Sequence, residues 1–173
     1  ARNASGCHEK GDIIRMGNWS RSGYLFGDAV RKTDSAIALT GVGLSGIVWV
    51  QGESDGWAIN NDTLTKAEYQ EALTDLIARF RAHYGSSLPF FIVRTGTNIT
   101  MSDSGFQQVR DVQDSVAKND PYTMITYRKT VDFASMGWMN DNFHYSQQGY
   151  NDIGVVTADS IAAYLDSHPQ AVS

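Results

Sequence analysis

Two short stretches of the sequence carry side chains that could perform acyl transfer. The first is Gln51-Gly52-Glu53, which directly follows the apolar run of residues 47–50. A short β-branched run of this kind is typical of a strand buried in a parallel sheet. In open α/β sheets, ligands bind where the chain leaves such strands. The amide of Gln51 could donate a hydrogen bond to a developing oxyanion. Glu53, when ionised, only accepts hydrogen bonds, and the plain alternative for it is a solvated carboxylate at a strand end.

The second stretch is Asp141-Asn142-Phe143-His144. An Asp three residues before a His on a loop can fold back, so that its carboxylate accepts the Nδ1 proton of the imidazole. Nε2 is then left to act as the general base that a nucleophile requires. The alternative is a surface turn with an incidental histidine. We predict that both stretches meet in one hydrolytic site.

The predicted elements alternate in a way that brings these two stretches to one edge of a sheet. Apolar runs predict three strands, at residues 47–50, 89–93 and 122–127. Helical periodicity predicts helices at 66–84, 104–118 and 146–165, and an earlier one at 23–39 that is interrupted near residues 33–34. Capping boxes are predicted at Thr65 with Glu68 and at Ser104 with Gln107. Residues 1–22 and 54–65 read as loop, with a short strand or turn at 12–14. This order predicts a parallel sheet with helices on both faces.

Composition limits the classes of protein to consider. A chain of 173 residues that is 42% hydrophobic is predicted to form a single domain over residues 1–173. The net charge is −5 without any basic stripe, so we expect neither nucleic acid nor an anionic membrane as partner. No apolar stretch reaches the roughly 18 residues of a membrane span, and no signal pattern opens the chain.

Metal chemistry and internal disulfides are not expected. Cys7 is the only cysteine, and His8, His83 and His168 show no shared metal-ligand spacing. We therefore predict no cofactor and no metal. Four triplets, at Asn3, Asn18, Asn61 and Asn98, fit the N-glycosylation acceptor pattern, several of them by chance. The sequence does not decide the cellular compartment, and an extracellular location is our working guess.

The two chemical stretches resemble motifs of a known family. Residues 49–55, Trp-Val-Gln-Gly-Glu-Ser-Asp, and residues 141–150, from Asp141 to Tyr150, are similar to those of the SGNH hydrolases. The likeness is to their carbohydrate esterase branch of sialate O-acetylesterases and acetylxylan esterases. It implies a flavodoxin-like three-layer α/β/α sandwich and removal of O-acetyl groups from sugars without a metal. By this resemblance His144 is the base, Asp141 orients it, Gln51 lies in the oxyanion hole, and the backbone N–H of Gly11 completes that hole.

One departure from the family pattern concerns the nucleophile. The family's serine lies in a Gly-Gln-Ser-Asn type block after the first strand, and this sequence has no such block. Ser5 is the nearest candidate by position, but only four residues precede it, too few for a strand. The expectation is that the first strand and its serine are missing here. A preceding segment or a separate N-terminal polypeptide would then supply them, or the chain alone would be inactive.

Three side chains are candidates for binding the sugar. Glu53 could accept hydrogen bonds from sugar hydroxyls. Arg94, after the second strand, could bind the carboxylate of a sugar acid in a bidentate fork, which would favour sialate over xylan, or could equally pair with Glu53. Trp138, like Trp57, could pack flat against a sugar ring, with core packing as the alternative.

These observations predict a serine-type esterase whose partner is an acetylated carbohydrate. The alternative is a non-catalytic carbohydrate-binding or structural module that retains the esterase fold. A lower alternative is a lipid esterase of another α/β hydrolase class, which chain-length preference on aryl esters would separate.

Overall fold

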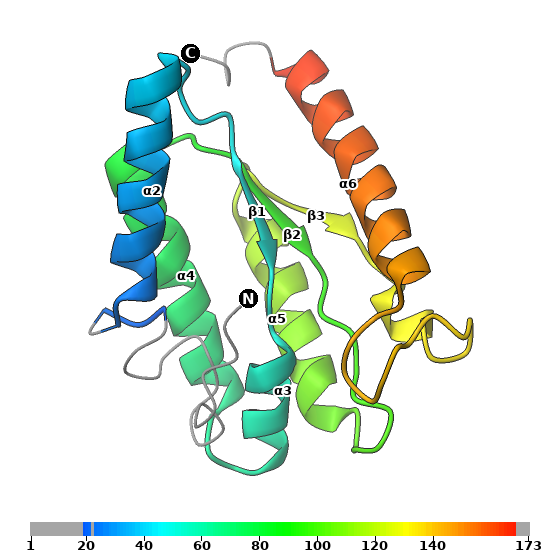
Figure 1. Ribbon diagram of the computed structural model, residues 1–173. Helices are drawn as coiled ribbons and strands as arrows, with labels where there is room; N and C mark the ends of the chain where they lie inside the picture. Colours follow the sequence, from blue (N-terminus) through cyan, green and yellow to red (C-terminus); the bar gives the residue numbers. More distant parts are fainter. Residues whose placement is uncertain (1–18, 22, 169–173) are drawn as a thin grey trace.

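Three parallel strands form the centre of the molecule in this computed structural model, which describes residues 19–21 and 23–168 (Figure 1). Within this part of the chain the strands are β1 (Ile47–Val50), β2 (Phe90–Val93) and β3 (Thr123–Tyr127), in the order β1-β2-β3. All four residues of β2 are buried, as expected of a central apolar strand with neighbours on both sides. The predicted strand or turn at residues 12–14 lies outside the described residues.

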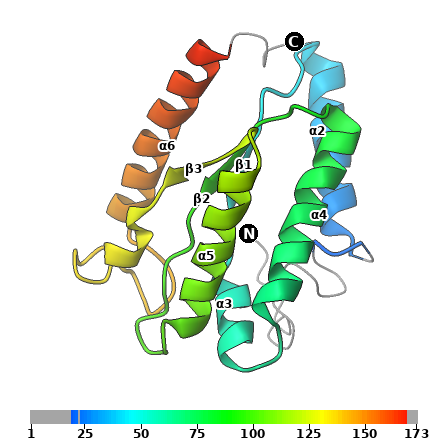
Figure 2. The ribbon, with the colours of Figure 1, turned by 180° about the vertical axis from the view of Figure 1, so that it is seen from behind.

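Helices cover both faces of the sheet. On one face, α4 (Lys66–Tyr84) and α5 (Ser104–Asn119) pack side by side (Figure 2). On the other, α6 (Gln147–Ser167) crosses β2 and β3, where the rings of Tyr164 and Phe91 meet edge to face at 5.4 Å. This confirms the predicted α/β class with a parallel sheet between two helical layers.

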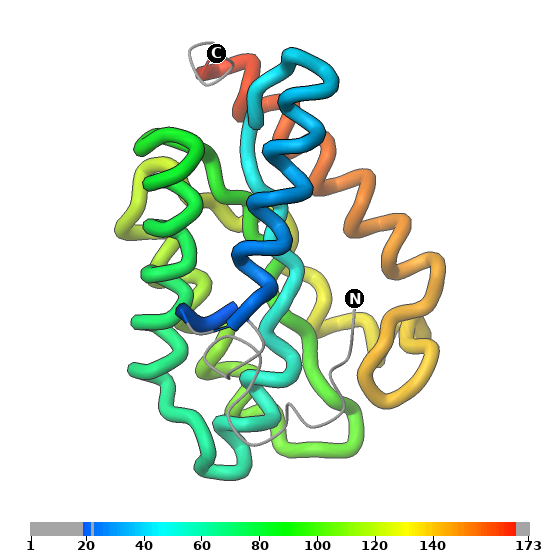
Figure 3. Tube along the Cα trace, turned by 60° about the vertical axis from the view of Figure 1, so that its left-hand side comes forward, coloured from blue at the N-terminus to red at the C-terminus, as the bar shows by residue number. Residues whose placement is uncertain are grey.

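A further helix, α2 (Leu25–Thr40), lies on the β1 side of the sheet (Figure 3). It packs against α4, where the rings of Phe26 and Phe80 are 4.8 Å apart and the Tyr84 hydroxyl donates to the Val30 carbonyl at 3.2 Å. The predicted interruption near residues 33–34 is wrong, because the helix runs unbroken to Thr40. No residue of α2 is fully buried, so the helix lies at the margin of the core.

Local capping signals were right at α4 and wrong at α5. At the start of α4, Thr65 and Glu68 form the predicted capping box. At α5 the N-cap is Asp103 and makes no side-chain capping bond, whereas Ser104 is already helical. The predicted box fails because Gln107 reaches along the helix to Asp111 at 2.7 Å instead of back to the N-cap.

The segment after β1 also differs from the prediction. Residues expected as polar loop form α3 (Glu53–Asn60), whose members Asp55, Gly56, Ala58 and Ile59 are buried. A short 3-10 helix, η2 (Lys129–Asp132), lies in the loop that follows β3. In α6, Tyr150 was expected on the core face but is 45% exposed, whereas Ile153 is buried.

The core divides into two clusters on either side of the sheet. The larger one joins β1, β2, α4 and α5 around Trp49, Phe80 and Phe90. The smaller one surrounds Phe133 and holds the loop before α6 in place. Both candidate stretches are therefore attached to packed structure.

Candidate active site

Gln51 and His144 line one cavity, although 93 positions separate them in the sequence. The cavity has a volume of ≈ 970 Å³ and runs along β1 to the carboxyl edge of the sheet. Its polar end consists of Gln51, Glu53, Ser54, Asn98, His144 and Tyr145. Its other end is apolar, formed mainly by β1 and α2. The two stretches chosen from the sequence thus border the same space.

The imidazole of His144 is held by the carboxylate of Asp141. Asp141 Oδ2 lies 2.8 Å from His144 Nδ1, and Asp141 Oδ1 accepts the backbone N–H groups of Phe143 and His144, both at 2.7 Å. These bonds, first that from the backbone of His144, lower the pKa of the Asp141 carboxyl to about 2. The carboxylate is therefore ionised at neutral pH and selects the tautomer with the proton on Nδ1.

The other ring nitrogen of His144 is available. Among the residues that the structure describes, none donates a hydrogen bond to its Nε2 and none accepts one from it. The side chain of His144 is 57% exposed. Since His144 lines the cavity, Nε2 can exchange a proton with a group bound there.

Gln51 is fixed by a hydrogen-bonded network at the ends of β1 and β2. Its side-chain Nε2 donates to Asp55 on α3, and its backbone carbonyl oxygen accepts from Gln113 Nε2 at 3.0 Å. Gln113 Oε1 in turn accepts the backbone N–H of Thr95 at 2.9 Å. Asp55 and Gln113 are fully buried, so this network is shielded from water. One Nε2–H of Gln51 is thus used in positioning the amide, and the second has no partner among the described residues and can serve a ligand.

Gly52 allows the chain to turn between Gln51 and Glu53. Its φ is +149°, and a Cβ at this position would lie 2.8 Å from Val109 Cγ1 and 2.9 Å from Thr95 Cβ. Only glycine accepts both this backbone conformation and this close approach. The glycine therefore brings Glu53 onto the first turn of α3 beside the cavity.

Tyr145 is a site residue to which the sequence assigned no role. Its hydroxyl donates to Glu53 Oε1 at 3.2 Å, and burial together with the Glu53 carboxylate raises the pKa of the phenol. Its position directly after His144 was the available signal.

Asn98 was also missed, because it was considered only as a glycosylation acceptor. It is buried and lines the cavity, and its Oδ1 accepts from the backbone and hydroxyl of Thr100.

Two of the predicted sugar-binding side chains do not line this cavity. Arg94 Nη2 lies 3.3 Å from Asp114 Oδ2 on α5, so its partner is neither of the two considered from the sequence. Trp138 packs against Phe133 at a ring distance of 5.3 Å in the smaller core cluster. Trp57, in contrast, does line the cavity.

Other predictions fall outside the described residues or concern absences. Gly11, Ser5 and Cys7 lie in the segment that the structure does not describe. Among residues 19–21 and 23–168, no group of three or more His, Cys, Asp or Glu is placed to hold a metal ion. Within the same residues, no helix combines the length and apolarity needed to span a bilayer.

A comparison with known families covers most of the chain. The family model for "Carbohydrate esterase, sialic acid-specific acetylesterase" matches residues 7–163, which include every site residue above. Neither a curated protein nor a solved structure matches the chain. The matched span covers most of the sequence, and the chain therefore belongs to the sialic acid-specific acetylesterase family of carbohydrate esterases, within the SGNH hydrolase superfamily.

Proposed function

We propose that this chain forms the base and oxyanion side of a carbohydrate O-acetylesterase that works by serine-type acyl transfer. The observation that carries the proposal is the shared cavity of Gln51 and His144, with Asp141 bonded to the imidazole. In such a reaction His144 Nε2 takes the proton of the nucleophile and returns it to the leaving sugar oxygen. The free N–H of Gln51 stabilises the tetrahedral oxyanion, with the backbone N–H of Gly11 as the proposed second donor. Glu53 accepts hydrogen bonds from the sugar.

The nucleophilic serine is proposed to come from a preceding segment or a separate polypeptide. The exposed side of β1 supports this part of the proposal. Within the described residues β1 pairs only with β2, and Val48 and Val50 are 49% and 52% exposed. An uncharged apolar edge strand is unusual in a finished sheet, because edges are normally covered or charged. A strand added parallel to β1 would end beside Gln51, where a serine could reach His144.

Hydrolysis of para-nitrophenyl acetate tests the proposal. The assay uses the full chain alone and, if the intact mass reveals a copurifying polypeptide, the full chain together with that polypeptide. His144→Ala is expected to abolish hydrolysis. His83→Ala is the matched control, because His83 also contacts an aspartate, Asp34 at 3.1 Å, but does not line the cavity. Equal activity of His144→Ala and the unsubstituted protein would refute the assignment.

Labelling with a serine-directed phosphonate locates the nucleophile. A label on a serine of an added preceding segment or of a second polypeptide is the expected result. Binding of acetylated glycan without any labelled serine would favour the alternative, a carbohydrate-binding module that retains the esterase fold.

A further inference from the structure

The loop between β2 and α5 lies beside the loop that carries His144 (Figure 1). This β2–α5 loop comprises residues 94–103, and the His144 loop comprises residues 133–146. The backbone N–H of Ile99 donates to the carbonyl of Asn142 at 3.2 Å. A hydrogen bond thus joins the two loops two residues before the histidine.

A close contact joins the same two loops directly after the histidine. Tyr145, which follows His144, is buried, and its hydroxyl lies so close to Gly96 that a Cβ at this glycine would overlap it. The β2–α5 loop therefore contacts the chain on both sides of His144. The carboxylate of Asp141 orients the imidazole ring, whereas these two contacts fix where the ring lies.

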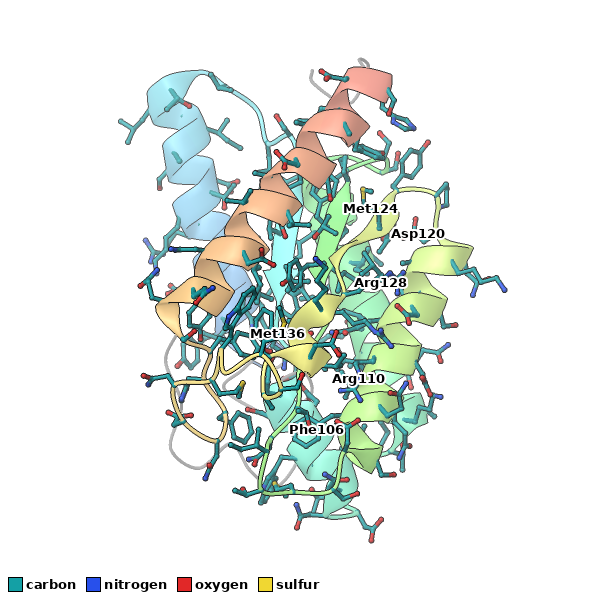
Figure 4. All side chains as sticks on the ribbon, turned by 90° about the vertical axis from the view of Figure 1, so that its right-hand side faces the viewer. Phe106, Arg110, Asp120, Met124, Arg128 and Met136 are labelled. Carbon is teal, nitrogen blue, oxygen red and sulfur yellow. The ribbon has the colours of Figure 1, made fainter. Side chains whose placement is uncertain are left out.

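Arg110, in the middle of α5, bonds the β2–α5 loop near both of its ends (Figure 4). Its Nη1 donates to the carbonyl of Gly96 at 2.8 Å, and its Nη2 donates to the carboxylate of Asp103. Nε and Nη2 also donate to Gln107 Oε1, at 3.3 and 3.0 Å. The fork of the guanidinium thus spans the loop from its third residue to its last.

The part of the loop between these two bonds reaches the cavity. Asn98 is buried there and lines the cavity, and its Oδ1 accepts the backbone N–H and the hydroxyl of Thr100 at 2.9 and 2.7 Å. The tip of the loop is therefore held by its own bonds. A displacement at Gly96 or Asp103 would move Asn98 and Ile99 together.

The burial of Arg110 is costly if stability alone is considered. Its side chain is 1% exposed, whereas that of its partner Asp103 is 52% exposed. Desolvation of a guanidinium offsets much of what its bonds contribute, so such a group adds little net stability compared with an apolar core. A buried charge can instead select one arrangement of the chain, because other arrangements leave its donors unpaired.

We propose that Arg110 is a positioning residue of this site, which fixes the β2–α5 loop against the His144 loop and so sets the place of the imidazole in the cavity. The proposal rests on the esterase function above, in which the base must lie within hydrogen-bond reach of the nucleophile. A misplacement of about 1 Å can cost about 10²-fold in rate. Loss of the fork should therefore act on kcat and leave KM nearly unchanged.

A conservative substitution tests the proposal with para-nitrophenyl acetate as substrate. Lysine at position 110 keeps the charge but cannot reproduce the fork, so it loses bonds to the loop. Arg110→Lys is expected to lower kcat by about 10- to 100-fold and to change KM by less than about threefold. Gly96→Ala, which displaces Tyr145, should lower kcat in the same way with Arg110 intact. An unchanged kcat in Arg110→Lys would overturn the proposal.

Arg81→Lys is the matched control. Like Arg110, Arg81 is largely buried and donates to a backbone carbonyl, that of Leu88 at 3.0 Å, and to an aspartate, Asp120. It lies at the amino edge of the sheet and does not line the cavity. Arg81→Lys should lower Tm and leave kcat unchanged. If both lysine variants lose kcat equally, the effect of Arg110 is structural only and the proposal is refuted.

A readout without turnover separates this proposal from the esterase assignment. If para-nitrophenyl acetate is not cleaved, the proposed function fails, and NMR then follows the two loops directly. In Arg110→Lys the Ile99 amide should exchange with solvent faster and the signals of the His144 ring should shift, whereas Arg81→Lys should change neither. Unchanged Ile99 exchange and His144 signals in Arg110→Lys would refute the positioning role whether or not the protein is an esterase.

Discussion

Replacement of Gly105 by alanine is expected to destabilise the protein through the contact between α3 and α5. Gly105 lies in the first turn of α5, and its backbone N–H donates to Asn60 Oδ1 at 2.8 Å. A Cβ at this position would lie 2.8 Å from the backbone nitrogen of Asn60 and closer still to the carbonyl oxygen of Gly56. Both atoms belong to the backbone of α3, so no side chain can rotate away. The two helices must separate.

The size of the effect follows from this geometry. Overpacking of a tight contact, with the weakened bond to Asn60 included, typically costs about 1–3 kcal/mol. For a domain of this length each kcal/mol lowers Tm by about 2–4 °C, so Gly105→Ala should melt about 2–12 °C below the unsubstituted protein. Thermal unfolding followed by circular dichroism measures the shift.

Gly154→Ala provides the control with the opposite sign. Gly154 lies on the exposed side of α6, and a Cβ there would meet no heavy atom within 4 Å. Alanine at this site is expected to stabilise the protein by about 0.5–1 kcal/mol through helix propensity. If Gly105→Ala melts at or above the unsubstituted protein, the close packing of α3 on α5 is refuted. The same packing positions α3, whose first residue is Glu53, so the substitution should also weaken sugar binding.

Further predictions concern buried charge, pH and the oxyanion donor. Arg110 is 1% exposed and bonded to the loop after β2 (Figure 4), so Arg110→Met should lower the free energy of unfolding by about 2–4 kcal/mol. Arg128→Met, which removes an exposed pair, should cost less than about 1 kcal/mol, and urea denaturation compares the two. Hydrogen bonds lower the pKa of Asp141 from 3.8 to about 2, so its stabilising contribution is complete above about pH 4 and is lost as pH falls through about 2. Unfolding curves of Asp141→Asn between pH 2 and 6 should lack this component, and a difference that grows on acidification would contradict it. Gln51→Ala should lower kcat on para-nitrophenyl acetate by about 10²- to 10³-fold, and a change below about threefold would remove Gln51 from the oxyanion hole.

Elements with strong local signals were predictable from the sequence. The capping box of Thr65 and Glu68 and the regular apolar face from Tyr69 to Phe80 define α4 without tertiary information. The apolar runs that became β1 and β2 are equally clear. These strands, together with the rule that ligands bind at the carboxyl edge of a parallel sheet, were sufficient to predict that Gln51 lies near the His144 loop.

Elements that depend on tertiary contact were not predictable. The sequence of α3 contains Gly56 and Asn60, which are poor helix formers, and its eight residues are too few for a stable isolated helix. It is helical because Gly105 and Phe106 of α5 pack closely on it, a contact that no local pattern encodes. The pairing of Arg94 with Asp114 has the same cause, since it depends on how α5 lies against the end of β2.

The two halves of the site differ in how they are held. Among the described residues, the carboxylate of Asp141 bonds only groups within three residues of itself, so its own loop orients His144. The side-chain amide of Gln51 depends instead on Asp55 from α3, and its backbone carbonyl is bonded by Gln113 from α5, which also bonds the end of β2. A disturbance in the packing of α3 and α5 therefore acts directly on the Gln51 amide. It reaches the His144 loop through Tyr145, which donates to Glu53 Oε1, and through Phe143, whose ring lies 6.3 Å from that of Phe106. Because β1 is also an edge strand among the described residues, we expect a segment that paired with it to order the Gln51 side of the cavity, where the proposed oxyanion donor lies.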